Sequence, residues 1–115
     1  MNLLEVNNSI QNNLFLQETA QQLEKDFLMI GINFDIDTPV SDYKYLFSLT
    51  YHLVNALNEQ NPKKVLNLLY RIDLSEVKVK EEMLKTELSF TEMLSEMIVN
   101  REIKKVLIKN YFSNS

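Results

Sequence analysis

Glycine occurs only once in the 115 residues of this chain, and proline only twice. All-β folds need many tight turns, and tight turns draw heavily on these two residues. A chain so poor in both favours a few long helices joined by short connections. The length suits one domain with a modest core. The sequence therefore predicts an all-α bundle of four or five helices, as a single domain spanning residues 1–115.

The composition argues against several classes of protein. The absence of cysteine excludes disulfides and thiolate metal sites. Residues 1–60 hold two lysines and eight acidic residues, whereas residues 61–115 hold ten basic and eight acidic ones. The acidic first half makes nucleic acid an improbable partner. No stretch approaches the ~20 apolar residues of a membrane span, and the first residues lack the pattern of a signal peptide. We expect a cytoplasmic protein.

The first predicted helix covers residues 9–30, with Asn8 or Ser9 as its N-cap. Its apolar residues recur at steps of three and four, which is typical of one buried helical face. They are Leu16, Ala20, Leu23, Phe27 and Ile30. Gly31 follows directly, at the position where a helix ending in the left-handed conformation favours glycine. Residues 32–40 are expected to form a loop that tucks Phe34 and Ile36 under the bundle.

The second predicted helix, residues 42–60, is apolar on almost every side, so we expect it at the centre of the core. Ser41 is its expected N-cap. Tyr43, Phe47 and Tyr51 form an aromatic stripe at a spacing of four residues. Such a stripe is usually core; the alternatives are a ligand pocket or a surface that stacks on bases.

Capping signals divide the rest of the chain. Asn61 followed by proline predicts a third helix over residues 62–73. Ser75 can cap a fourth helix over residues 76–88. Ser89 and Glu92 have the spacing of a capping box, which predicts a fifth helix over residues 90–111. Because neither glycine nor proline interrupts this region, one continuous helix over residues 75–111 is the alternative.

No residue pattern indicates catalysis, a metal or a cofactor. His52 is the only histidine and has no orienting partner in the sequence, so we expect a packed or half-exposed helical residue. Asp35, Asp37 and Asp42 lack the central glycine and terminal glutamate of a calcium-binding loop. They are better explained as loop and capping residues. The sequence therefore predicts a protein that is not an enzyme.

Residues 101–109 form a basic amphipathic segment. We expect the solvated face of a terminal helix; an acidic partner, a membrane surface and nucleic acid are the alternatives. Arg101 stands where the apolar stripe of the fifth helix is expected to continue. Its guanidinium is expected to pair with Asp73 or Glu76, or to extend along the edge of the core to water.

The second half of the chain also resembles a known group of proteins. The residues that carry the resemblance are Leu69-Tyr70-Arg71-Ile72-Asp73-Leu74-Ser75-Glu76, followed by Arg101-Glu102 and Lys105. In these it is similar to short uncharacterised helical proteins of Bacteroidetes bacteria. The resemblance implies a bacterial, cytoplasmic setting and no catalytic activity.

Together these features predict a non-enzymatic module that binds a protein partner or forms a homo-oligomer, such as a dimer. One alternative is a ligand-binding or regulatory domain with an apolar pocket lined by the aromatic stripe. Another is association with nucleic acid through the basic second half. The candidate interaction or pocket residues are Tyr43, Phe47, Tyr51, Arg71, Asp73 and Arg101.

Overall fold

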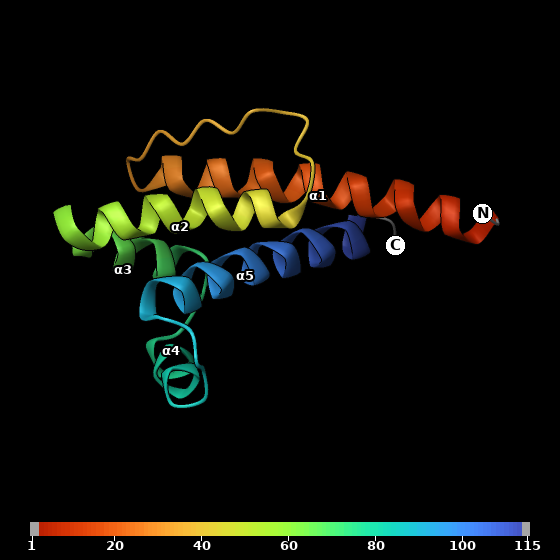
Figure 1. Ribbon diagram of the computed structural model, residues 1–115. Helices are drawn as coiled ribbons and strands as arrows, with labels where there is room; N and C mark the ends of the chain where they lie inside the picture. The colour runs from red at the N-terminus through yellow and green to blue at the C-terminus, as the bar shows by residue number, and fades with distance from the viewer. Residues whose placement is uncertain (1–2, 114–115) are drawn as a thin grey trace.

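The computed structural model describes the backbone of residues 3–113 and the side chains of residues 12–112. Within that range the chain forms helices and no strand, which confirms the predicted all-α class (Figure 1). The helices are α1 (Leu3–Met29), α2 (Tyr43–Gln60), α3 (Pro62–Arg71), α4 (Glu76–Met83) and α5 (Phe90–Ser113). None of these described helices combines the length and the apolar character that crossing a membrane requires.

The central helix of the bundle is α5, because it packs against α1, α2 and α4 (Figure 1). The expectation that residues 42–60 form the centre was wrong. α2 packs against α5 and α3, and only one of its faces is fully buried. That face consists of Leu46, Thr50, Val54 and Leu57. Phe47 and Leu53 lie beside this face and are partly exposed. α2 therefore has more apolar surface than the neighbouring helices cover.

The loop between α1 and α2 runs back along α1 and is tied to it by two polar side chains. The amide of Gln17 binds both backbone groups of Val40, at 2.7 and 2.8 Å. The carboxylate of Glu24 accepts from the backbone N–H of Ile36 at 2.8 Å. Ile36 and Val40 are buried, and the ring of Phe34 packs edge-on against Phe27 with 5.1 Å between centroids. The loop therefore covers the apolar seam of α1, as predicted for Phe34 and Ile36.

The ends of the helices follow local capping chemistry in most places. Gly31 has a φ of +84°, and the backbone N–H groups of Gly31 and Ile32 bond to the carbonyls of Leu28 and Phe27. This is the pattern of a Schellman motif. The hydroxyls of Ser75 and Ser89 each accept a backbone N–H three residues later, at 3.2 Å. The break between α4 and α5 is therefore present, and the continuous helix over residues 75–111 is not.

Several predicted boundaries differ from the structure. α1 begins at Leu3, so Asn8 and Ser9 lie inside it; their side chains are outside the described residues. Asp42 caps α2 in place of Ser41, with its carboxylate accepting from Tyr45 N–H at 2.8 Å. A carboxylate at this position also interacts favourably with the helix dipole. Asn61 makes no side-chain cap bond at the start of α3.

α4 ends at Met83, earlier than the predicted residue 88, and it buries little of its apolar surface. Val79 is its one buried residue, whereas Val77, Met83 and Leu84 are exposed. Short helices depend on tertiary packing for most of their stability. The segment from Leu84 to Ser89 therefore leaves the helix before α5 begins.

α3 also ends before its predicted limit, at Arg71. Asp73 follows with a φ of +64°, and the N–H groups of Asp73 and Leu74 bond to the carbonyls of Tyr70 and Leu69. The bonding pattern matches that at Gly31, with an aspartate in the position that favours glycine. A left-handed backbone is strained for a residue with a side chain, although aspartate tolerates it better than most.

Candidate functional site

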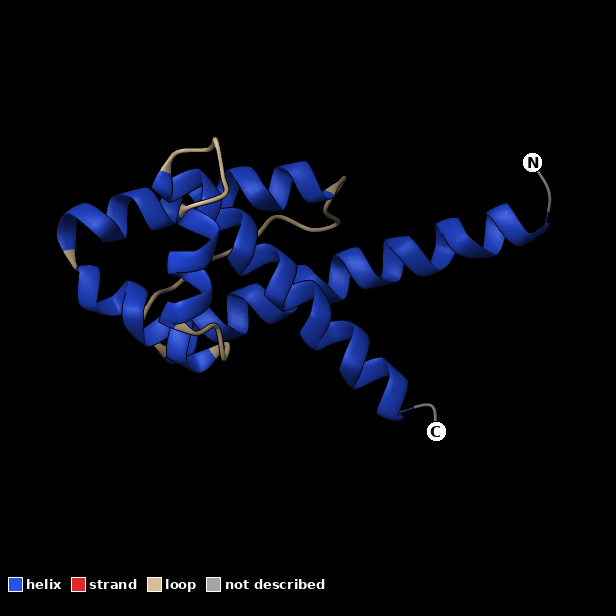
Figure 2. Ribbon diagram, turned by 90° about the horizontal axis from the view of Figure 1, so that it is seen from below, coloured by secondary structure: helices blue, strands red, loops and turns tan. Residues whose placement is uncertain are grey.

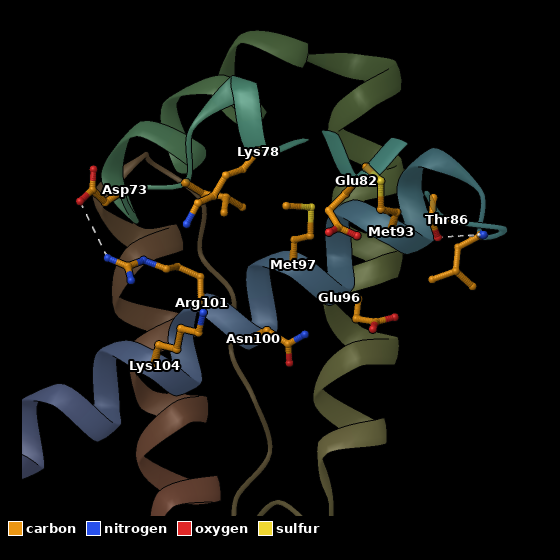
Figure 3. A pocket seen from close by; sticks show the side chains of 12 residues that line it. Asp73, Lys78, Glu82, Thr86, Met93, Glu96, Met97, Asn100, Arg101 and Lys104 are labelled. Carbon is orange, nitrogen blue, oxygen red and sulfur yellow. Dashed lines mark hydrogen bonds and ion pairs between the residues drawn. The ribbon is translucent and has the colours of Figure 1, made fainter. Parts of the chain in front are cut away.

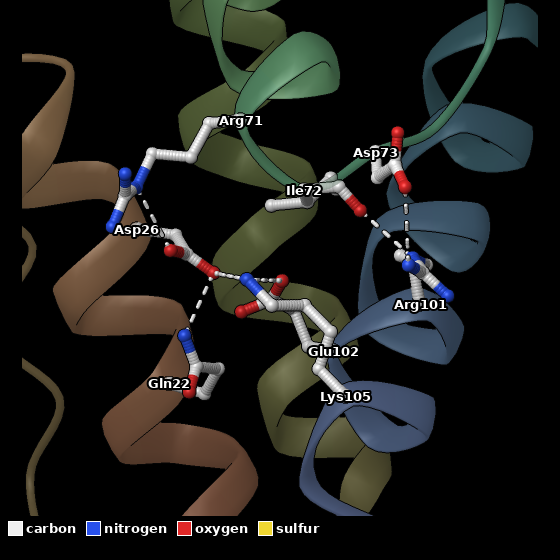
Figure 4. A network of polar contacts seen from close by, with 8 residues as sticks. All are labelled: Gln22, Asp26, Arg71, Ile72, Asp73, Arg101, Glu102 and Lys105. Atoms are coloured by element: carbon white, nitrogen blue, oxygen red, sulfur yellow. Dashed lines mark hydrogen bonds and ion pairs between the residues drawn. The ribbon is translucent and has the colours of Figure 1, made fainter. Parts of the chain in front are cut away.

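A cluster of polar side chains built around two buried carboxyl groups joins α1, α3 and α5 (Figure 4). We call it the Asp26 cluster, and it consists of Gln22, Asp26, Arg71, Glu102 and Lys105. Asp26 is 1% exposed and Glu102 is 0% exposed. The carboxylate of Asp26 accepts from Arg71 Nε at 3.1 Å, from Lys105 Nζ at 2.7 Å and from Gln22 Nε2 at 3.0 Å. One buried carboxylate thus holds three helices together.

Glu102 completes the cluster in its neutral form. Burial, a hydrogen bond with Asp26 and the charge of Asp26 together raise the pKa of Glu102 to about 9. As a carboxylate, Glu102 would face the ammonium of Lys105 at 3.8 Å and accept no hydrogen bond. As a carboxylic acid it can donate to Asp26, which lowers the pKa of Asp26 against the opposing effect of burial. The two carboxyl groups therefore carry one negative charge between them.

This pair was not predicted from the sequence, in which Arg101 was expected on the buried stripe instead. The buried row of α5 is Leu94, Ile98, Glu102 and Val106, spaced four residues apart. The signal in the sequence was a glutamate continuing an apolar row at exact helical spacing. Asp26 carries a similar signal, because it lies three residues after Leu23 of the α1 seam. A carboxyl group at either buried position needs a polar partner, and only the tertiary structure shows that Asp26 and Glu102 are neighbours.

Arg101 lies at the edge of the core and ties α5 to the end of α3 (Figure 4). Its Nε donates to the carbonyl of Ile72 at 2.7 Å, and its Nη2 lies 3.8 Å from the carboxylate of Asp73. The side chain of Asp73 is 92% exposed, so this predicted pair exists but is weak. Glu76, the other predicted partner, accepts a hydrogen bond from the hydroxyl of Tyr70 instead.

The aromatic stripe of α2 divides between two environments. Tyr43 and Phe47 line a shallow groove on α5 of about 300 Å³, beside Val99 and Ile103. Tyr51 does not line it; its ring packs edge-on against the neighbouring His52, with 5.6 Å between centroids. The three aromatic residues therefore do not form the enclosed pocket that the alternative function requires. Of the other candidate residues, Arg71 belongs to the Asp26 cluster, and Asp73 and Arg101 border a groove between α4 and α5.

The last turns of α5 present apolar side chains to solvent. Leu107, Ile108 and Tyr111 are 43%, 51% and 73% exposed, and we call these three residues the terminal apolar stripe. They lie on the side of the helix away from the buried row. Asn110 donates to the carboxylate of Glu18 at 2.9 Å, and beyond this contact α1 and α5 diverge (Figure 2). The end of α5 and the first turns of α1 therefore project from the bundle.

The carboxyl groups of the Asp26 cluster are out of reach of a substrate because they are buried. Among the described residues, no group of three or more histidine, aspartate or glutamate side chains could hold a metal ion.

No protein-family model, curated protein or solved structure matches this chain. The resemblance to Bacteroidetes proteins and the cytoplasmic setting stay predictions.

Proposed function

We propose that this chain is a non-enzymatic interaction module that pairs with a second copy of itself through the terminal apolar stripe. The observation that carries the proposal is the exposure of Leu107, Ile108 and Tyr111 on the last turns of α5. Adjacent apolar side chains on the surface of a folded domain mark places that another molecule covers. A helix-on-helix contact suits a projecting helix, because it needs one apolar face and no preformed pocket.

Charge complementarity favours a second copy as the occupant. The end of α5 is basic, with Lys104 and Lys109 near the stripe, whereas the neighbouring part of α1 carries the acidic Glu18. Two-fold symmetric dimers are the commonest protein oligomers. A two-fold axis would place the terminal apolar stripes of the two copies against each other, with the basic end of each α5 beside Glu18 of the other copy's α1. Opposite charges would then meet at both of the equivalent contacts.

Sedimentation equilibrium over a wide range of concentrations tests this proposal. The parent chain should reach twice its monomer mass, and the double variant Ile108→Glu with Tyr111→Glu should stay at the monomer mass. Circular dichroism should show that the double variant keeps its helices, because both side chains are exposed. The matched control is Leu84→Glu, which replaces an apolar residue that is 90% exposed at the end of α4, outside the stripe. This control should still form the dimer.

A crosslinking experiment locates the contact independently. Because the chain has no cysteine, the variant Ile108→Cys carries a single thiol in the stripe. Oxidation should link two copies through a disulfide, whereas Leu84→Cys should give no covalent dimer at the same concentration. A parent protein that stays monomeric at every concentration would show that self-association is wrong.

A further inference from the structure

An open groove of about 300 Å³ lies between α4 and α5 (Figure 3). Its apolar floor is made of Leu74, Leu88, Met93 and Met97. Methionine side chains adapt to ligands of different shape. The volume is at the lower limit for small-molecule sites. The groove is on a different part of α5 from the terminal apolar stripe. Ligand binding in the groove does not depend on self-association.

The charged residues of the groove are segregated by sign. Lys78, Arg101 and Lys104 reach toward one end of the groove, near Asp73, while Glu82 and Glu96 lie on the other side of Met97 (Figure 3). Both helices contribute to this order. Lys78 precedes Glu82 by one turn of α4, or roughly 6 Å, and Glu96 precedes Lys104 by eight residues of α5, or roughly 12 Å.

These charges have unused bonding capacity in the described part of the chain. The ammonium groups of Lys78 and Lys104 make no ion pair there, and neither do the carboxylates of Glu82 and Glu96. Arg101 uses Nε on Ile72 and directs Nη2 toward Asp73. A guanidinium has five N–H donors, so several remain for a ligand. The groove thus has a cationic end and an anionic end, separated by an apolar floor.

We propose that this groove binds a short apolar peptide with free termini, of about three residues. The carboxylate of the peptide would lie among Lys78, Arg101 and Lys104, because guanidinium and ammonium groups bind carboxylates through charge-assisted hydrogen bonds. The terminal ammonium would lie near Glu82 and Glu96. An extended tripeptide spans about 10 Å, which agrees with the separation of the two charged ends. Its side chains would cover Met93 and Met97.

The geometry argues against other occupants of the groove. A helical peptide would need a longer groove with several anchor positions, and the volume is too small for that. A fatty acid matches the cations, but its apolar tail would lie beside the carboxylates of Glu82 and Glu96, which would lose hydration without gaining a partner. A ligand with both a carboxylate and an ammonium uses both ends.

The test uses the full chain with ¹³C-labelled methionine methyl groups and the tripeptide Leu-Ala-Leu in four forms. These are the free peptide, the N-acetyl peptide, the C-terminal amide and the peptide blocked at both ends. The free peptide should shift the methyl signals of Met93 and Met97 but not that of Met29, which is exposed on α1. Removing either terminal charge should weaken binding by at least about threefold, as expected for a partly exposed charge contact.

Variants test which residue of the groove binds each terminus of the peptide. Lys78→Met should weaken binding of the free peptide and leave binding of the C-terminal amide unchanged. Glu82→Gln should weaken binding of the free peptide and leave binding of the N-acetyl peptide unchanged. The matched controls Lys80→Met and Glu81→Gln replace exposed α4 residues that do not line the groove, and should change neither.

Three results would overturn the proposal. One is the absence of any shift of Met93 and Met97 at a peptide concentration of about 10 mM. Another is equal affinity for all four peptides, which would reduce the groove to an apolar contact. The last is full binding of the N-acetyl peptide, which would indicate a simple amphipathic anion as the ligand.

Discussion

The carboxyl groups of Glu102 in α5 and Asp26 in α1 lie on either side of the Lys105 ammonium, at 3.8 and 2.7 Å, and burial beside Asp26 raises the pKa of Glu102 to about 9, so that the pair carries one proton. Arg71 and Lys105 offset the remaining charge on Asp26. Removing one of these cations leaves a buried carboxyl group with less compensation for its charge. Stability should therefore depend on pH through Glu102, in a direction opposite to that of an ordinary carboxylate.

The free energy of unfolding should fall as the pH rises from about 5 to about 9. In the unfolded chain Glu102 has an ordinary pKa of 4.5, whereas in the folded chain its pKa is about 9. Between these values the folded state holds a proton that the unfolded state has lost, so a rise in pH favours unfolding. Asp26 acts in the opposite sense, because its pKa is lowered and its contribution is lost in acid.

The variant Glu102→Gln checks this assignment, because an amide keeps the shape and the donor of the carboxylic acid but does not ionise. Urea unfolding at pH 5, 7 and 9 should show a much flatter pH dependence than in the parent. At pH 9 the variant should be the more stable of the two. The exposed Glu81→Gln serves as control and should follow the parent curve. An equally steep decline in Glu102→Gln would mean that another group titrates.

Asp73→Gly should raise the free energy of unfolding by about 0.5–1 kcal/mol, because glycine adopts the left-handed conformation without strain. Loss of the ion pair with Arg101 should reduce this gain in stability only slightly, since the carboxylate of Asp73 is exposed. Asp73→Ala loses the same carboxylate without relieving the backbone, so it should destabilise the protein. Thermal denaturation of the two variants compares these effects. A destabilised Asp73→Gly would show that the pair with Arg101 matters more than the backbone.

Leu46→Ala should destabilise the protein by about 2–5 kcal/mol, the range for a buried leucine that leaves a cavity. Leu46 is fully buried on the inner face of α2, whereas Leu53 is only partly buried. Leu53→Ala should therefore lower the free energy of unfolding by a smaller amount, about 1 kcal/mol. Urea denaturation of both variants measures the difference. Equal losses at the two positions would mean that α2 is enclosed on more sides than the bundle shows.

Arg101 illustrates how far a single position can be predicted. Its chemistry led to the expected contact with Asp73, because the fork of a guanidinium at the edge of a core seeks an acceptor. The stronger acceptor is the carbonyl of Ile72, a backbone group that no side-chain pattern reveals. The adjacent Glu102, and not Arg101, occupies the buried row. An offset of one residue on a helix is a rotation of about 100°. An error of one residue in the position of the buried row therefore exchanged the buried residue and the residue at the edge of the core.

The amino-acid sequence by itself determined the helical class and most of the helix ends. The scarcity of glycine and proline, Gly31 after α1, and the caps Ser75 and Ser89 act over a few residues, and local chemistry suffices to predict them. The tertiary structure alone decided that α5 is central and that Lys105 reaches Asp26, 79 residues away in the chain. Burial, a raised pKa and charge segregation across a groove depend on which distant residues become neighbours. The spacing of residues within one helix does not reveal those neighbours, because distant residues come together only when the whole chain packs.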